Sequence, residues 1–245
     1  MLKKIPIKLV MIGHIDKIVD ISEIKKHKSN LFTIQETSRI SDLPSPEKND
    51  GYFDIYYSKE EVSKMLHSIN YDGICIAIMN YRYDDDFYMH RVGQNKVCIS
   101  ISNLEQILNR KDITLENFMI KNIYEILSFY VVFKSNLEED VYEFGHEDTR
   151  GCLFDFNGDK NDIIYNTEKV KICHECLSKI NKKDIPNDFI ETLNQELLTI
   201  DKPILKRLEL FIKQYPFISI FITFIFSVSI NLFSNLLWEL LKPTQ

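Results

Sequence analysis

The sequence predicts an α/β (α+β) domain followed by one C-terminal transmembrane helix. Short apolar runs alternate with capped helical segments, which is the pattern of a sheet covered by helices. Near the end of the chain, the run from Phe217 to Trp238 contains no charged residue and is long enough to cross a bilayer. A chain of 245 residues accommodates one medium-sized domain with its own core in addition to this helix.

Apolar runs predict the strands, and capping residues predict the helices. The expected strands are 7–12, 31–36, 74–79 and 97–101, with 74–79 in the centre of the sheet. Ser58 with Glu61 and Ser102 with Glu105 have the spacing of capping boxes, and Thr114 is placed to cap a long helix over 115–134. Further helices are expected over 16–25 and 187–200.

Composition sets the domain limits and the compartment. We expect a cytosolic domain over 1–184, a helical connector over 185–215, the transmembrane helix over 216–241 and a short tail over 242–245. Basic residues precede the helix, which predicts a single-pass protein of the cell inner membrane with the N-terminal domain in the cytoplasm. These residues are Lys202, Lys206, Arg207 and Lys213. In that reducing compartment the five cysteines are expected to be thiols or metal ligands.

Charge and glycine content exclude some functions. The net charge of −6 argues against general nucleic-acid binding. The chain has seven glycines and no Gly-rich phosphate-binding loop, which argues against the common nucleotide-binding folds.

Four residues in the second half of the domain have the pattern of a metal site. His146 and Cys152 are followed by a C-x-x-C element, Cys173 and Cys176. Three thiolates and one imidazole form a tetrahedral zinc site in which protein supplies every ligand, so the expected Zn²⁺ is structural. Two alternatives remain: Cys152 is a core thiol beside an incidental C-x-x-C, or His174 replaces His146.

The segment from Cys152 to Cys176 resembles the C-terminal zinc knuckle of archaemetzincin-type metalloproteases. The resemblance covers roughly residues 5–180 and implies a metzincin-like mixed sheet with helices. In that family a long helix carries HExxHxxGxxH, which binds the catalytic zinc. The best match here is Tyr124-Glu125-Ile126-Leu127-Ser128, which keeps the glutamate and lacks both histidines. We therefore expect a degenerate domain, a pseudoenzyme without proteolytic activity.

Polar residues form a row along the apolar helix. Ser219, Thr223, Ser227 and Asn231 recur every fourth residue, joined by Ser234 and Asn235, and Ser229 lies off the row. Polar side chains at membrane depth usually face a partner helix or water, so the row predicts a homo-oligomer, a tetramer or similar. We expect it to serve as a helix-packing surface or as the lining of an ion pore, and the remaining alternative is a simple anchor.

The segment from Tyr81 to Arg91 mixes aromatic and charged residues. Such a loop suits a nucleotide or oligonucleotide ligand, held by aromatic stacking and by cations. The candidate residues are Tyr81, Arg82, Tyr88, His90 and Arg91. The alternative is a solvated hairpin without a ligand.

These features together predict a non-enzymatic, oligomeric membrane effector. Its cytosolic domain would sense a ligand and control a helix bundle or ion channel, an architecture similar to that of bacterial antiviral effectors of abortive infection. One alternative is a membrane-tethered zinc metallohydrolase with other ligands, such as His14, His67 or His90. The other is a tail-anchored, zinc-containing adaptor without conductance.

Overall fold

The structure, a computed structural model, describes residues 3–47, 55–139, 144–200, 208 and 211–241, without the side chains of residues 187 and 235–241. The chain divides into two units, Met1–Asp201 and Lys202–Gln245. Each unit is described by itself. The connector predicted over 185–215 lies partly, and the tail over 242–245 wholly, outside the described residues.

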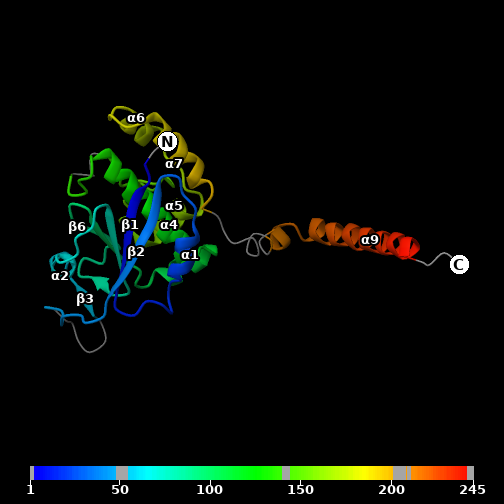
Figure 1. Ribbon diagram of the computed structural model, residues 1–245, viewed down its shortest axis with the longest axis horizontal. Helices are drawn as coiled ribbons and strands as arrows, with labels where there is room; N and C mark the ends of the chain where they lie inside the picture. The colour runs from blue at the N-terminus through cyan, green and yellow to red at the C-terminus, as the bar shows by residue number, and fades with distance from the viewer. Residues whose placement is uncertain (1–2, 48–54, 140–143, 201–207, 209–210, 242–245) are drawn as a thin grey trace. The chain divides into compact units, whose positions relative to one another are not determined.

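The first unit is built on a mixed β-sheet (Figure 1). Its strands are β1 (Ile5–Ile12), β2 (Phe32–Ile40), β4 (Ile74–Met79), β6 (Met89–Gly93) and β7 (Lys96–Ser100). Among the described strands the order is β2–β1–β4–β7–β6, with β6 antiparallel to β7 and the other pairs parallel. Two short parallel strands, β3 (Tyr56–Tyr57) and β5 (Arg82–Tyr83), form a second sheet. This confirms the predicted fold class, including the central position of β4.

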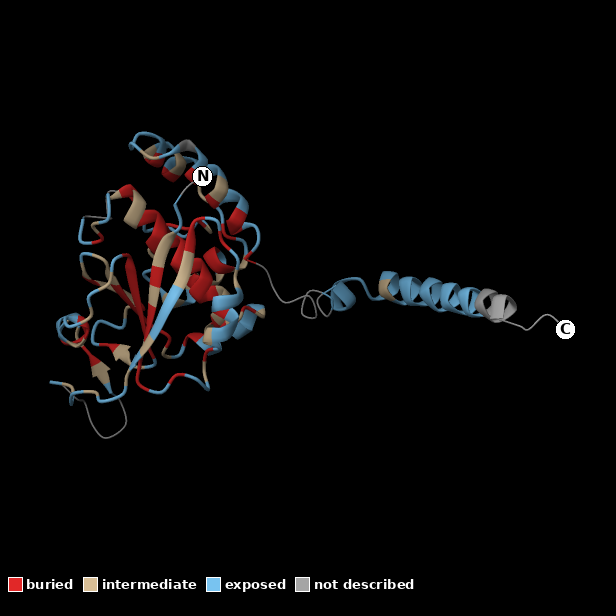
Figure 2. Ribbon diagram, viewed as in Figure 1, coloured by how far each residue is buried: buried red, intermediate tan, exposed pale blue. Residues whose placement is uncertain are grey.

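Helices cover both faces of the large sheet. They are α1 (Ile21–Lys26), α2 (Lys59–Leu66), α3 (Leu104–Leu108), α4 (Leu115–Val132), α5 (Tyr165–Glu168), α6 (His174–Asn181) and α7 (Asn187–Leu197). Side chains alternate between the faces, so Leu9 and Ile76 join the core formed with α4, whereas Val10 and Ala77 pack with α2. β4 is buried along its whole length, as expected of a central parallel strand covered on both sides (Figure 2).

Local capping explains where the helices begin. The capping box of Ser58 and Glu61 opens α2 with both hydrogen bonds in place, and Thr114 accepts the Asn117 N–H at the start of α4. The second predicted capping box, Ser102 with Glu105, is wrong. The N-cap of α3 is Asn103, which enters the helix at φ 62° and makes no side-chain capping bond.

The second unit contains α9 (Pro216–Leu241), which is 26 residues long. Its segment Pro216–Ser234 has a mean hydropathy of 2.1 and no burial within the described structure. This helix is therefore long and apolar enough to cross a membrane. Pro216, which has no amide N–H, is its first residue, and residues 211–214 form helix ahead of it.

Candidate metal centre

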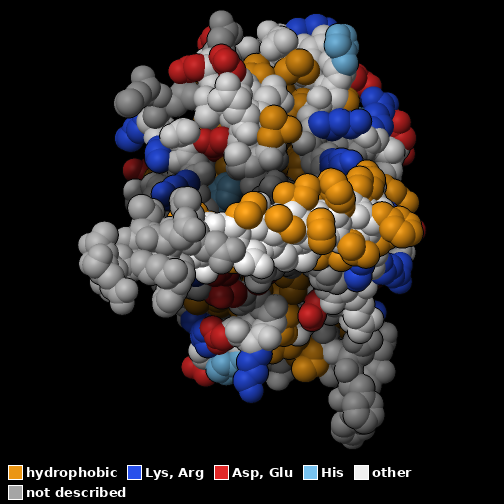
Figure 3. All heavy atoms as spheres, turned by 90° about the vertical axis from the view of Figure 1, so that its right-hand side faces the viewer, with side chains coloured by type: hydrophobic (Ala, Val, Ile, Leu, Met, Phe, Trp, Pro, Cys, Tyr) orange, Lys and Arg blue, Asp and Glu red, His pale blue; other side chains and the backbone are white. Residues whose placement is uncertain are grey.

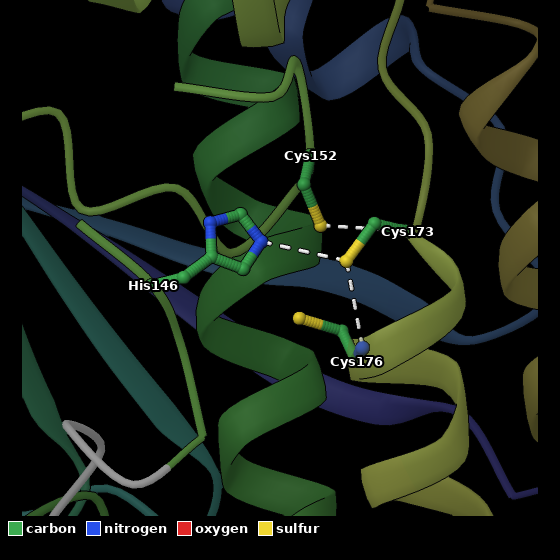
Figure 4. A group of neighbouring side chains, drawn as sticks. All are labelled: His146, Cys152, Cys173 and Cys176. Atoms are coloured by element: carbon green, nitrogen blue, oxygen red, sulfur yellow. Dashed lines mark hydrogen bonds between the residues drawn. The ribbon is translucent and has the colours of Figure 1, made fainter. Parts of the chain in front are cut away.

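The four predicted zinc ligands come together in space (Figure 4). The imidazole nitrogen of His146 and the sulfur atoms of Cys152, Cys173 and Cys176 lie within 4.8 Å of one another. Cys173 is the N-cap of α6, and Cys176 lies in its first turn, so the start of one helix presents both thiols. His146 and Cys152 lie in preceding loops that β-bridges tie to Asp155 and Lys171.

Backbone amides point at the sulfur atoms, as they do around metal-bound thiolates. The Cys173 N–H donates to Cys152 Sγ at 3.3 Å, and the Cys176 N–H donates to Cys173 Sγ at 3.5 Å. Cys173 Sγ lies 3.4 Å from His146 Nε2. Hydrogen bonds from amides stabilise negative charge on sulfur. The backbone is thus arranged to support thiolates.

Asp155 contacts both the His146 ring and the backbone beside Cys152. Its side chain is fully buried, and Oδ1 lies 3.0 Å from His146 Nδ1, on the side of the ring that faces away from the thiols. Its other oxygen accepts the amide N–H groups of Cys152 and Arg150 at 2.9 and 3.0 Å. The hydrogen-bond partner of Nδ1 is the Asp148 backbone carbonyl, at 3.0 Å, and the Asp155 carboxylate adds an ionic contact to the same nitrogen. Together they favour the tautomer that leaves Nε2 available to a metal.

Cys152 differs chemically from the two cysteines that lie in strands. A hydrogen bond from the Cys176 thiol, with help from backbone amides, lowers the pKa of Cys152 to about 5. In contrast, burial raises the pKa of Cys75 to about 11 and that of Cys98 to about 12. The two strand cysteines are therefore inert core thiols, as their apolar surroundings predict.

The donor set fits Zn²⁺. Zinc–sulfur bonds of about 2.3 Å in a tetrahedron separate the ligand atoms by about 3.8 Å, which the observed cluster reaches with small movements. Three sulfurs and one imidazole are the ligands of structural zinc sites. Since protein fills all four positions, the bound ion would join two loops to α6 and would have no position for a reacting water.

In α4, which contains the match to the HExxH element, the side chains at the two histidine positions and the glutamate make other contacts. The Tyr124 hydroxyl bonds His27 Nε2 at 2.7 Å and Glu196 at 2.9 Å, and Ser128 Oγ donates to the Tyr124 carbonyl. Glu125 forms a buried 2.7 Å ion pair with Lys121, one turn earlier. Among the described residues, the four ligands above are the one group with at least three metal-binding side chains in reach of each other. His14 and His67 lie elsewhere: His14 lies beside Arg39, and His67 follows α2.

A cleft of about 690 Å³ opens between β6 and α4. Three of the five predicted ligand-binding residues, Tyr88, His90 and Arg91, line it, together with Glu125. Tyr88 is buried and its ring packs edge-to-face against Phe118. A carboxylate oxygen of Asp85 lies 2.9 Å from His90 Nε2.

The other two predicted ligand residues do not line this cleft. Tyr81 packs edge-to-face on Tyr57, at 5.6 Å between ring centroids, and Arg82 belongs to β5. Of the five predicted ligand-binding residues, Tyr88, His90 and Arg91 are therefore the candidates for this cleft, and the binding of a ligand stays a prediction.

In α9 four hydroxyl groups donate hydrogen bonds within the helix. Each donates to the carbonyl oxygen four residues earlier, at 2.9 Å, for Ser219, Thr223, Ser227 and Ser229. Ser229 lies off the predicted row, so this bonding does not distinguish the row from its surroundings. Asn231 and Ser234 are exposed, and the side chain of Asn235 lies outside the described residues.

Comparison with known proteins supports the fold. No protein-family model and no curated protein matches the chain. Among solved structures it resembles the crystal structure of archaemetzincin from Methanopyrus kandleri, with a TM-score of 0.51 and 14% sequence identity. The match covers 73% of this chain and 94% of that chain. The domain therefore has an archaemetzincin-like mixed sheet with helices.

This likeness contradicts the prediction that the chain is not an enzyme, since the matched fold is that of a zinc metallopeptidase. The prediction rested on the loss of two histidines, at Tyr124 and Ser128. Changes at two positions of one helix say nothing about catalysis by other residues of the domain. The description of the chain as a pseudoenzyme is therefore withdrawn.

Proposed function

We propose that this chain is a single-pass membrane protein whose archaemetzincin-like domain binds a ligand and controls an assembly of α9 helices. The observation that carries the proposal is the apolar surface of α9: its segment Pro216–Ser234 is long and apolar enough to cross a membrane, and hydrophobic side chains cover the side of the helix seen in Figure 3. A helix that is apolar over most of its surface is stable in lipid and unstable in water. The basic residues before it favour the inner membrane with the domain in the cytoplasm.

Self-association is the part of the proposal that depends on the polar row. Because its hydroxyls already donate within the helix, a lone α9 is tolerated in lipid. The hydroxyl oxygens still have lone pairs, and the Asn231 amide lies exposed on the same row. An amide in hydrocarbon gains a partner when helices pack, and small hydroxyl residues let helices approach closely. A dimer or larger assembly, such as a tetramer, follows.

The cleft between β6 and α4 is the proposed ligand site. It combines cations (Lys59, Arg91), carboxylates (Asp85, Glu147) and the half-buried ring of Phe87. A nucleotide or short oligonucleotide would use the cations and the ring, as in the signal-gated antiviral effectors that this architecture resembles. That analogy is one of architecture.

Mass measurement in detergent, followed by flux from liposomes, tests this function. The full chain should form an assembly larger than one chain, and flux should change when mononucleotides or short oligoribonucleotides are added. Ser227→Leu with Asn231→Leu should abolish both properties, and Ser229→Leu, off the row, should preserve them. A single chain per micelle contradicts the proposal, and an assembly that never conducts favours an adaptor.

A membrane-tethered metallohydrolase is the second candidate. It is favoured by Glu125, a residue that lines the cleft and whose pKa is raised by burial. A buried carboxylic acid with a raised pKa suits general acid–base catalysis. Against this role, the same carboxylate pairs with Lys121.

Zinc-loaded protein incubated with a peptide library tests this candidate. The substitution pair Lys121→Met and Glu125→Leu removes the carboxylate without leaving an unpaired buried charge. Cleavage that this pair abolishes, and that the exposed change Glu105→Gln preserves, supports hydrolysis. The absence of any cleavage by zinc-loaded wild type rejects it.

A further inference from the structure

One segment of the chain joins the candidate metal centre to the cleft between β6 and α4. The imidazole of His146 faces the thiols (Figure 4), and its backbone carbonyl accepts the Phe156 N–H at 3.1 Å. Glu147, Phe156 and Gly158 line the cleft. Residues 146–158 therefore carry a predicted zinc ligand and also supply part of the cleft wall.

The start of this segment depends on the metal centre for its position. Leu153 and Phe154, in its middle, are fully buried in the core. Residues 147–150 are exposed, and the buried His146 precedes them. The position of Glu147 in the cleft wall is thus tied to that of its neighbour His146.

The three thiols of the metal centre differ in their access to solvent. Cys152 and Cys176 are fully buried, whereas Cys173 is only partly buried. Cys173 is also the N-cap of α6, and its Sγ accepts the Cys176 N–H at 3.5 Å. An accessible sulfur that accepts an amide N–H and has a second cysteine within reach is the arrangement of cysteines that undergo reversible oxidation. Cys173 is thus the outer and Cys176 the inner residue of such a pair.

We infer that Cys173 is a site of reversible oxidation by peroxides, and that its disulfide with Cys176 opens the metal centre and loosens the adjoining cleft wall. The ligand atoms of the centre lie within 4.8 Å of one another. A disulfide bond of about 2 Å therefore requires the two sulfurs to approach by less than about 3 Å. Any consequence for a ligand in the cleft rests on the proposed function.

Two substitution steps at sulfur give this disulfide. The Cys173 thiolate attacks one oxygen of hydrogen peroxide: an S–O bond forms, the O–O bond breaks, and hydroxide leaves. The Cys176 thiolate then attacks the sulfur of the resulting sulfenic acid: an S–S bond forms, the S–O bond breaks, and a second hydroxide leaves. Hydrogen peroxide accepts the two electrons that the sulfurs lose. His146 and Cys152 then remain, and two ligands are too few for a closed zinc site.

Peroxide treatment of the zinc-loaded full chain in detergent tests this inference. A chromophoric chelator should record release of the bound zinc, and mass spectrometry of alkylated peptides should find a disulfide between Cys173 and Cys176. Dithiothreitol with added zinc should restore the starting state, because thiols reduce a disulfide by exchange. Retention of zinc under peroxide overturns the inference, as does a disulfide that includes Cys152. A chain that takes up no zinc overturns it as well.

Two variants identify the reactive sulfur. Cys173→His keeps a zinc-binding donor and removes the accessible thiol, so zinc release should slow by about tenfold or more. The double change Cys75→Ala with Cys98→Ala removes the two core thiols and should release zinc as fast as wild type. Equal release rates for Cys173→His and wild type overturn the role of Cys173. Disulfide mapping in wild type decides the question by itself where a variant fails to bind zinc.

Hydrogen exchange tests the effect on the cleft wall. Oxidation should speed exchange of the Phe156 N–H by about tenfold or more, because its acceptor is the His146 carbonyl. Exchange in β4, the central strand, should stay unchanged. Equal exchange at Phe156 before and after oxidation overturns the coupling of the metal centre to the cleft.

Failure of the inference can be separated from failure of the proposed function. A chain that assembles and conducts but keeps its zinc under peroxide rejects only the oxidation site. A chain that releases zinc on oxidation but remains single in detergent rejects only the proposed function.

Discussion

Replacement of Asp155 by asparagine should weaken zinc binding without touching a ligand. The aspartate lies 3.0 Å from His146 Nδ1 and accepts two amide N–H bonds through its other oxygen. Asparagine can present an oxygen to the amides or to the imidazole, so one contact is lost along with the charge. Losing a partner of this kind typically costs 10- to 100-fold in metal affinity, about 1.4 to 2.7 kcal/mol.

Competition for zinc with a chromophoric chelator measures this affinity directly. Asp148→Asn is the matched control, since its carboxylate lies 3.8 Å from the same nitrogen but its side chain is 64% exposed. We expect the control to change affinity by roughly twofold or less, because exposed ion pairs contribute little. Equal losses for the two variants, or no loss for Asp155→Asn, would refute the reasoning.

Three further predictions concern the buried polar groups of the domain. Lys121→Met alone should lower the free energy of unfolding by about 3–5 kcal/mol, because it leaves Glu125 buried and unpaired. The double change Lys121→Met with Glu125→Leu should be nearly neutral. A urea titration in which the double variant is less stable than the single variant would contradict this. Glu196→Ala should cost about 3–5 kcal/mol, because the carboxylate accepts hydrogen bonds from Ser29, Asn30 and Tyr124, at 2.6, 2.5 and 2.9 Å; a melting temperature equal to that of wild type would be inconsistent with that network. Burial lowers the pKa of His27 below 6.5, so the unfolded chain binds a proton at this residue more readily than the folded chain does. The free energy of unfolding should therefore fall as the pH drops below about 6.5. His27→Gln should flatten this part of the pH profile measured by denaturant unfolding, and an unchanged profile would rule out His27 as its source.

Elements whose signal is local were predictable from the sequence. β4 reads as a continuous apolar run because helices bury both of its faces, and the Ser58 capping box is contained within four consecutive residues. The start of α3 was mispredicted because Asn103 adopts a left-handed conformation, and no short-range pattern distinguishes this from capping by Ser102.

The zinc ligands were predictable because cysteine and histidine spacing reflects coordination geometry. Asp155, which supports them, was missed, and the signal that could have found it is its position three residues after Cys152, where its oxygen receives that residue's N–H. The bond from Tyr124 to Glu196 spans 72 positions of sequence, so only the fold brings the two together. For the same reason the sequence did not reveal that Tyr81 packs against Tyr57 whereas His90 lines the cleft.

Alkaline carbonate treatment of membranes from cells that express the full chain tests the central claim most directly. If α9 spans the bilayer, the protein should stay in the pellet, and a chain shortened to residues 1–201 should be found in the supernatant. Release of the full chain by carbonate would show that α9 packs against protein rather than lipid, and would contradict the account.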